Sequence, residues 1–106
     1  MKAAAAIYIG PVLILIASIP MALNLVPKNG FYGYRTPRTM SGSDADWYQA
    51  NRTCGRALIV AEAITLLIFA LLPLLPIRRD LILPIRYGVF LLSIAAGMIY
   101  TAVRAG

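Results

Sequence analysis

The sequence contains no histidine, a single cysteine (Cys54) and four acidic residues. Without histidine, the chain cannot form histidine metal sites, histidine proton relays or the Ser-His-Asp arrangement of hydrolases. One cysteine excludes an internal disulfide and a cysteine-rich metal site. Four acidic residues also make paired-carboxylate hydrolysis a poor candidate. We therefore expect a non-enzymatic protein that uses no metal and no cofactor.

Charged residues are scarce as well, at 13% of the 106 residues, whereas hydrophobic residues make up 60%. A domain of this size has too little interior to hide so much apolar surface, so the bilayer is the expected solvent. The net charge is +6, but the basic residues lie mainly at the ends of apolar runs. This pattern is typical of membrane proteins rather than of nucleic-acid binding domains. The expected partners are membrane lipids and no nucleic acid.

Three long apolar runs occupy residues 4–26, 57–75 and 81–103. Each is close to the ~20 residues that a membrane-spanning helix needs. A signal peptide is the competing interpretation of the first run, but the run exceeds the usual ~7–15 apolar residues and no small-residue cleavage site follows. Gly10-Pro11 and Pro20 predict bends in its helix. The sequence thus predicts one all-α membrane domain over residues 1–106 with three transmembrane helices.

A polar segment, residues 27–56, separates the first two runs and is called the motif segment below. Prolines and glycines predict a loop over residues 27–43, and its interleaved aromatic residues favour the level of the lipid head groups. Ser43, followed by Asp44 and Asp46, is typical of a helix N-terminus. No helix breaker follows, so we expect an amphipathic interfacial helix that leads directly into the second span.

The basic residues predict how the chain lies across the membrane. One side, with the motif segment and the C-terminus, carries Lys28, Arg35, Arg38, Arg52, Arg56 and Arg104. The other side carries Lys2, Arg78 and Arg79. Because basic residues are enriched in cytoplasmic loops, the motif loop and the C-terminus of this multi-pass protein are expected in the cytoplasm.

The motif segment reads Pro27-x-Asn29-x-x-x-Gly33-x-Arg35-Thr36-Pro37-x-Thr39, then Trp47-x-x-x-Asn51-x-x-x-Gly55. Together with its place just before a spanning helix, this pattern resembles the SdpI family of small bacterial membrane proteins. The resemblance implies a location in the bacterial inner membrane and a role as an immunity or toxin-resistance protein. The best-known member protects a toxin-producing bacterium from its own secreted membrane-active peptide, and it holds a repressor at the membrane. That member has additional spans before the motif, whereas this chain has one.

The motif supplies candidate ligand-binding residues: Asn29, Gly33, Arg35, Thr36, Arg38, Thr39, Trp47 and Asn51. Glycines let backbone N–H groups approach a ligand closely, and the planar fork of arginine suits a carboxylate or a phosphate. The expected ligand is an anionic lipid or a peptide, such as a peptide toxin. A structural clasp is the alternative, in which Arg35 caps helix ends and Asn29 stabilises a turn.

Glu62 and Tyr100 complete the set of candidates. Helical spacing places Glu62 on the same face as Trp47 and Asn51, and an ionisable residue inside a span is a functional candidate. Its carboxyl group must be paired, hydrated or protonated. Arg86 lies too far along the third span, by roughly 20 Å, to be its partner. The expected partners are therefore Arg35 or Arg38 from the loop, or Tyr100.

The third apolar run carries two further patterns. Arg86 is expected to extend its side chain toward Arg78 and Arg79 at the membrane surface. Ser93, Gly97 and Thr101 form a series of small residues that favours close helix packing.

Three functions remain open from the sequence. The first is an immunity or resistance protein that binds its ligand at the motif. The second is a small oligomeric transporter or lipid-handling protein that uses Glu62 as a protonatable group. The third is a structural accessory subunit of a membrane complex. Formation of a homo-oligomer is also expected, because it would shield the polar side chains of a three-helix bundle.

Overall fold

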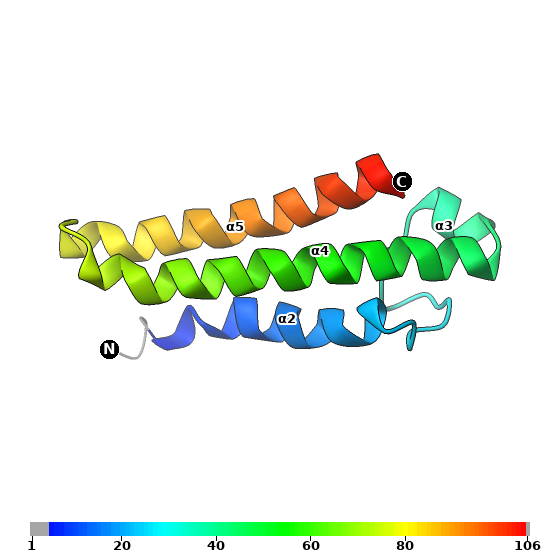
Figure 1. The fold of residues 1–106 in the computed structure, drawn as a ribbon, viewed down its shortest axis with the longest axis horizontal. Coiled ribbons are helices and arrows are strands. Elements are labelled where there is room, and N and C mark those ends of the chain that lie inside the picture. The colour runs from blue at the N-terminus through cyan, green and yellow to red at the C-terminus, as the bar shows by residue number, and fades with distance from the viewer. Residues whose placement is uncertain (1–4, 106) are drawn as a thin grey trace.

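A computed structural model describes residues 5–105, and within this range it is all-helical without strands. The helices are α2 (Ile9–Ala22), α3 (Pro37–Ser41), α4 (Asp44–Leu71), the 3₁₀ helix η1 (Leu72–Leu74) and α5 (Arg79–Arg104). Figure 1 shows α4 between α2 and α5, and α4 packs against both. The predicted all-α class is confirmed. Two residues used in the predictions lie outside the described range. Lys2 belongs to the predicted topology, and Ala4 is the predicted start of the first span.

Two helical segments, Asp44–Leu74 and Arg79–Arg104, are long and apolar enough to cross a membrane. The first apolar run forms a shorter helix than residues 4–26 suggest, because α2 has 14 residues. At 1.5 Å per residue, α2 is about 21 Å long, less than the ~30 Å of a hydrocarbon core. Prolines limit this helix: a turn at residues 7–8 precedes Gly10-Pro11, and α2 ends two residues after Pro20.

Backbone hydrogen bonds cap the C-terminus of α2. Asn24 adopts a left-handed conformation with φ 60°. The N–H of Leu25 donates to the Pro20 carbonyl at 2.9 Å, and the N–H of Asn24 donates to the Met21 carbonyl at 3.3 Å. These two bonds form a Schellman motif, which stops the helix and turns the chain into the motif segment.

Helix α4 begins where the sequence predicts. The Ser43 hydroxyl accepts from the Asp46 N–H at 3.1 Å, and the Asp46 carboxylate accepts from the Ser43 N–H at 3.3 Å. This capping box satisfies two backbone donors at the helix start. The helix then runs for 28 residues without a break. The interfacial part and the apolar part therefore form one continuous element, as predicted.

Glycines allow α4 to approach both neighbours closely. A Cβ atom on Gly55 would lie 2.5 Å from the Ala22 nitrogen of α2, and one on Gly97 would lie 2.6 Å from Leu58 of α4. Ser93 and Thr101 are buried one turn on either side of Gly97. The predicted packing role of this small-residue series is confirmed.

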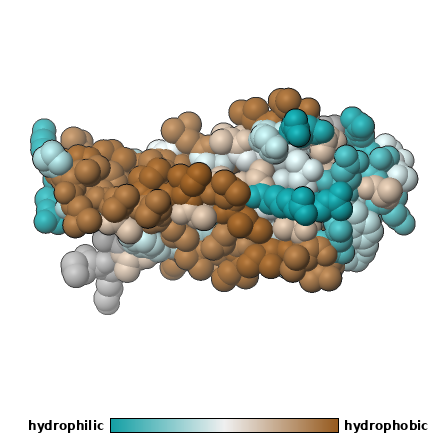
Figure 2. Space-filling view, in the orientation of Figure 1, coloured by the Kyte–Doolittle hydropathy of each residue, from teal (hydrophilic) through white to brown (hydrophobic). Residues whose placement is uncertain are grey.

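The surface is apolar along the bundle and polar at its two ends. Figure 2 shows hydrophobic residues over most of the visible length, polar residues around α3, and a small polar group at the opposite end. The end around α3, called the motif end, carries the motif loop and the C-terminus of α5. The opposite end carries Arg78, Arg79 and Asp80, and Arg78 pairs with Asp80 at 2.8 Å. This division of polarity suits a protein that crosses an apolar layer.

Candidate functional site

Trp47 and Asn51 attach the motif loop to α4. The Trp47 indole is fully buried and its Nε1 donates to the Val26 carbonyl at 2.7 Å. The Asn51 Oδ1 accepts from the Tyr34 N–H at 2.6 Å, and its Nδ2 donates to the Trp47 carbonyl at 3.0 Å. Both side chains come from the first two turns of α4, one turn apart, so they face the loop together. They hold the loop on the helix.

Asn29 and Gly33 shape the loop itself. The Asn29 Oδ1 accepts from the N–H groups of Phe31 and Tyr32, and its Nδ2 donates to the carbonyls of Pro27 and Tyr32. Gly33 has φ +113°, and a Cβ atom there would lie 2.6 Å from the Asn51 Oδ1. Glycine is needed for both the conformation and the space. Asn29 thus stabilises a turn, as the clasp alternative predicts.

Thr36 and Thr39 form a short helix inside the segment that the sequence predicts to be loop. Thr36 caps α3, and the two threonines satisfy each other's N–H groups at 3.1 and 2.7 Å. Pro37 stands at the first helical position, where its fixed φ favours a helix and its missing N–H does no harm. The prediction of an uninterrupted loop over residues 27–43 is therefore wrong at α3.

Arg35 and Arg38 are the exposed members of the predicted ligand-binding residues in the motif segment. One Arg35 nitrogen donates to the Gly30 carbonyl at 2.5 Å. Phe31 in the same loop is 95% exposed. The Tyr32 hydroxyl donates to the Ala17 carbonyl of α2, and desolvation by partial burial raises the pKa of this hydroxyl. The loop thus presents cationic and aromatic side chains at the surface, while Trp47 and Asn51 of α4 bind its backbone.

Glu62 is fully buried, and its partner is Ser93 of α5. The Ser93 Oγ lies 2.9 and 3.1 Å from the two carboxyl oxygens and 2.6 Å from the Phe90 carbonyl. The Ser93 hydroxyl donates to the Glu62 carboxyl group, and its single proton is shared with the Phe90 carbonyl.

The prediction that Glu62 pairs with Arg35, Arg38 or Tyr100 is wrong. Arg35 and Arg38 are exposed on the loop, and Tyr100 is 50% exposed on α5. The reason is register: the Glu62 position on α4 faces Ser93, two turns before Tyr100 along α5. Serine at this position could have been recognised in the sequence, because its spacing of four from Gly97 marks the buried face of α5.

Arg86 is buried instead of extending to the membrane surface, so that prediction is also wrong. Its Nη2 donates to the Phe69 carbonyl at 2.7 Å, and its guanidinium carbon lies 5.3 Å from the Tyr8 ring centroid. Pro73, four residues after Phe69, has no N–H to offer this carbonyl. Arg86 supplies the missing donor at the end of α4. The sequence signal for this role was the proline.

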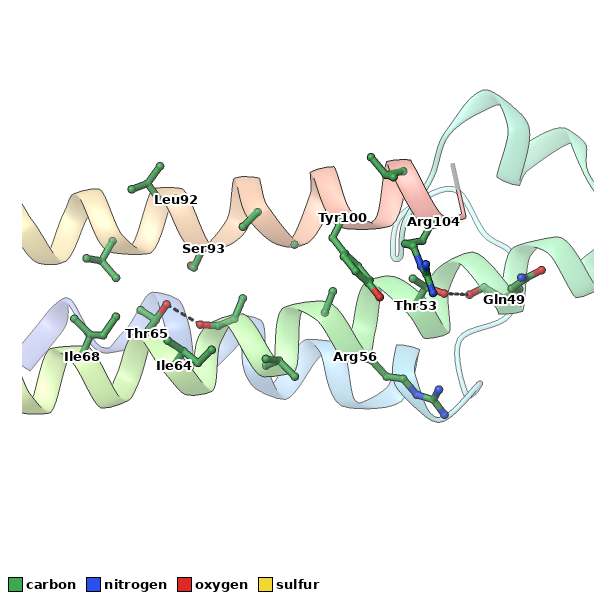
Figure 3. Close-up of a pocket in the computed structure, with 17 residues that line it drawn as sticks. Gln49, Thr53, Arg56, Ile64, Thr65, Ile68, Leu92, Ser93, Tyr100 and Arg104 are labelled. Atoms are coloured by element: carbon green, nitrogen blue, oxygen red, sulfur yellow. Dashed lines mark hydrogen bonds between the residues drawn. The ribbon is translucent and has the colours of Figure 1, made fainter.

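Tyr100 lies in a groove between α4 and α5 with a volume of about 1150 Å³, which sequence analysis did not identify. Figure 3 shows Tyr100 and Arg104 reaching from α5 toward Thr53 on α4. The groove exists because Ala57 and Ala61 of α4 and Ala96 of α5 are small. The sequence signal for this groove is the spacing of four residues between Ala57 and Ala61, which places two small side chains on the same face of α4.

Comparison with known proteins identifies the family. A search among curated proteins and among solved structures finds no match. A model of the SdpI/YfhL protein family matches residues 25–103, which include the whole motif segment, α4 and almost all of α5. The chain therefore belongs to the SdpI/YfhL protein family and, with its long apolar helices, is a membrane protein of that family.

Proposed function

We propose that this protein protects a bacterial cell envelope, as an immunity or resistance protein does, by binding an anionic lipid or peptide at the motif end. One observation carries the proposal. The buried polar side chains of the motif have partners within the protein, while Arg35 and Arg38 remain exposed. A motif built in this way holds the backbone that carries the two arginines in place at a surface. Exposed guanidinium groups of this kind suit the binding of an anionic group.

The proposed arrangement in the membrane has three spans, with α2 as the first. The apolar residues Leu23, Leu25 and Val26 follow the end of α2. Helix α2 packs along α4, which is itself long enough to cross. The motif end faces the cytoplasm, because most of the basic residues gather there. The membrane is the inner membrane of a bacterium, as the family resemblance implies.

Ligand recognition uses charge and apolar contact together. Arg35 uses one N–H for the Gly30 carbonyl, and its other donors are available for a carboxylate or a phosphate. Phe31 offers an exposed ring in the same loop. A ligand with an anionic group and an apolar part matches both side chains, and membrane-active peptides and lipids have this character.

The test is survival of cells that express the protein during exposure to a membrane-active peptide. We expect the double variant Arg35→Gln/Arg38→Gln to lose protection while its amount in the membrane stays unchanged. Arg79→Gln is the matched control, because Arg79 is an exposed arginine at the opposite end, and it should protect like the wild type. Full protection by the double variant would exclude the proposed function.

The buried Glu62 favours a second candidate function, a small transporter or lipid-handling protein. A carboxyl group buried inside a span, with one hydroxyl partner, can gain and lose a proton during a transport cycle. In liposomes, pH-dependent flux of a substrate should then disappear in Glu62→Gln. Absence of flux for anionic, cationic and lipid substrates in the wild type would rule this candidate out.

A further inference from the structure

The groove between α4 and α5 is separate from the surface of the motif loop. It is lined by residues of these two helices alone. None of the motif loop residues that carry the proposed function, Arg35 and Arg38 included, lies among them. The groove therefore calls for its own explanation.

The walls of the groove suit a hydrocarbon chain. Val60, Ile64 and Ile68 of α4 face Val89 and Leu92 of α5, and Ser93 and Thr65 are the polar side chains in this apolar part. Small residues form the floor: Ala57, Ala61, Ala96 and Gly97. Along α4 the apolar part of the lining extends from position 57 to position 68, which corresponds to about 17 Å at 1.5 Å per residue. This is about half the depth of a bilayer core, as suits one acyl chain of one leaflet.

The mouth of the groove is polar and cationic. Gln49, Thr53 and Arg56 of α4 and Tyr100 and Arg104 of α5 lie there, at the motif end. The Arg104 guanidinium carbon lies 5.8 Å from the Tyr100 ring centroid, which holds its charge over the groove. In Figure 3, Arg104 points toward Thr53 of α4, and Arg56 extends from α4 on the side away from α5. No acidic residue is among the described residues that line the groove.

We propose that the groove holds one anionic phospholipid, with its phosphate at the cationic mouth, where Arg56 and Arg104 lie, and an acyl chain along the aliphatic walls. Charge complementarity carries the choice of occupant: two cations stand at one end of an apolar channel that contains no counter-charge. A phospholipid has the same division of charge and hydrocarbon along its length. An apolar transmembrane helix, from a peptide or from a second copy, would leave both arginines without a partner. This inference goes beyond the proposed function because it rests on other residues.

Native mass spectrometry of the whole chain in a mild detergent tests the proposal, with phosphatidylglycerol and phosphatidylcholine as probes. We expect one tightly bound phosphatidylglycerol per chain and weaker binding of phosphatidylcholine. The double variant Arg56→Gln/Arg104→Gln should lower the affinity for phosphatidylglycerol by roughly ten-fold or more, since charge-assisted hydrogen bonds are lost. Binding of phosphatidylcholine should not change. Arg79→Gln, at an exposed position of the opposite end, should keep the phosphatidylglycerol affinity.

A second pair of variants tests the position of the acyl chain. Ala96 and Ala95 are both exposed on α5, but only Ala96 lines the groove. Ala96→Phe should fill the groove and weaken phosphatidylglycerol binding, whereas Ala95→Phe should leave it unchanged. Equal binding of the two lipids, or equal effects of the two phenylalanines, would overturn the proposal. The proposal would also be overturned if a cross-link at position 96 joined two copies of the chain and showed that a second copy, and not a lipid, fills the groove.

Discussion

At the scale of single residues, Asn51 shows why the motif has a strict pattern. Its amide accepts from one backbone N–H of the loop and donates to two carbonyls, at Tyr34 and Trp47. Only an asparagine provides both functions at this length, one turn after the tryptophan that binds Val26. The spacing of Trp47 and Asn51 is visible in the sequence. Whether the Asn51 amide binds a ligand or the backbone of the motif loop depends on the position of that loop, which only the structure gives.

Removal of the Asn51 amide should therefore destabilise the protein. Asn51→Ala leaves the Tyr34 N–H buried without a partner, and we expect a loss of about 1–3 kcal/mol in the free energy of unfolding. Gln49→Ala, at an exposed position of the same helix, should change stability little. Unfolding in detergent, followed by circular dichroism, measures both. Equal stabilities would mean that the clasp contributes nothing.

Arg86 gives a second prediction at this scale. Arg86→Leu removes the donor to the Phe69 carbonyl, and the loss should be about 1.5–3 kcal/mol, as for hydrogen bonds to charged groups. Pro73→Ala restores a backbone N–H four residues after Phe69. The arginine substitution should then cost less in a Pro73→Ala background than in the wild type, as a double-mutant cycle measures. An unchanged cost would show that the carbonyl contact is not the reason for burying Arg86.

At the scale of elements, the start of α4 was predictable and the extent of α2 was not. The Ser43–Asp46 capping box uses side chains that are neighbours in the sequence. The length of α2 depends on prolines near both ends and on the Schellman motif at Asn24, which hydrophobicity alone does not reveal. Apolar runs thus indicate that a helix exists better than they indicate where it stops.

Two helical glycines provide a matched test of the packing between elements. Gly55→Ala places a methyl group 2.5 Å from the backbone of Ala22, so α2 must move, and we expect a loss of about 1–3 kcal/mol. Gly88 of α5 has nothing within 4 Å of an added Cβ. Gly88→Ala should leave stability unchanged or raise it by up to ~1 kcal/mol through helix propensity. Thermal unfolding in detergent compares them, and similar losses would argue against a close contact at Gly55.

At the scale of the whole molecule, polar residues at two ends and an apolar middle define how the bundle meets the bilayer. The described residues extend over 50 × 24 × 18 Å, so the long axis exceeds the ~30 Å of hydrocarbon and leaves both ends in the head-group regions. In the proposed arrangement, the motif end and the Arg78–Asp80 end lie on opposite sides of the membrane.

Introduced cysteines can test this arrangement. Cys54 is buried, so the variants Ser41→Cys and Asp80→Cys are made in a Cys54→Ala background; both positions are exposed. In intact cells, a membrane-impermeant maleimide should label position 80 and not position 41. Labelling of both positions, or of position 41 alone, would contradict the proposed orientation.

The sequence by itself determined the all-α class, the long apolar helices, the continuous α4 and the family, because these follow from composition, periodicity and contacts between near neighbours. The tertiary structure decided which polar groups meet. It brought together three hydrogen-bonded pairs: Glu62 with Ser93, Arg86 with the Phe69 carbonyl, and Asn51 with the Tyr34 N–H of the motif loop. It also opened the groove that ends at Arg56 and Arg104. The physical reason is register: sequence spacing assigns a residue to a face of its helix, but the depth at which two faces meet depends on the packing of glycines and alanines between them.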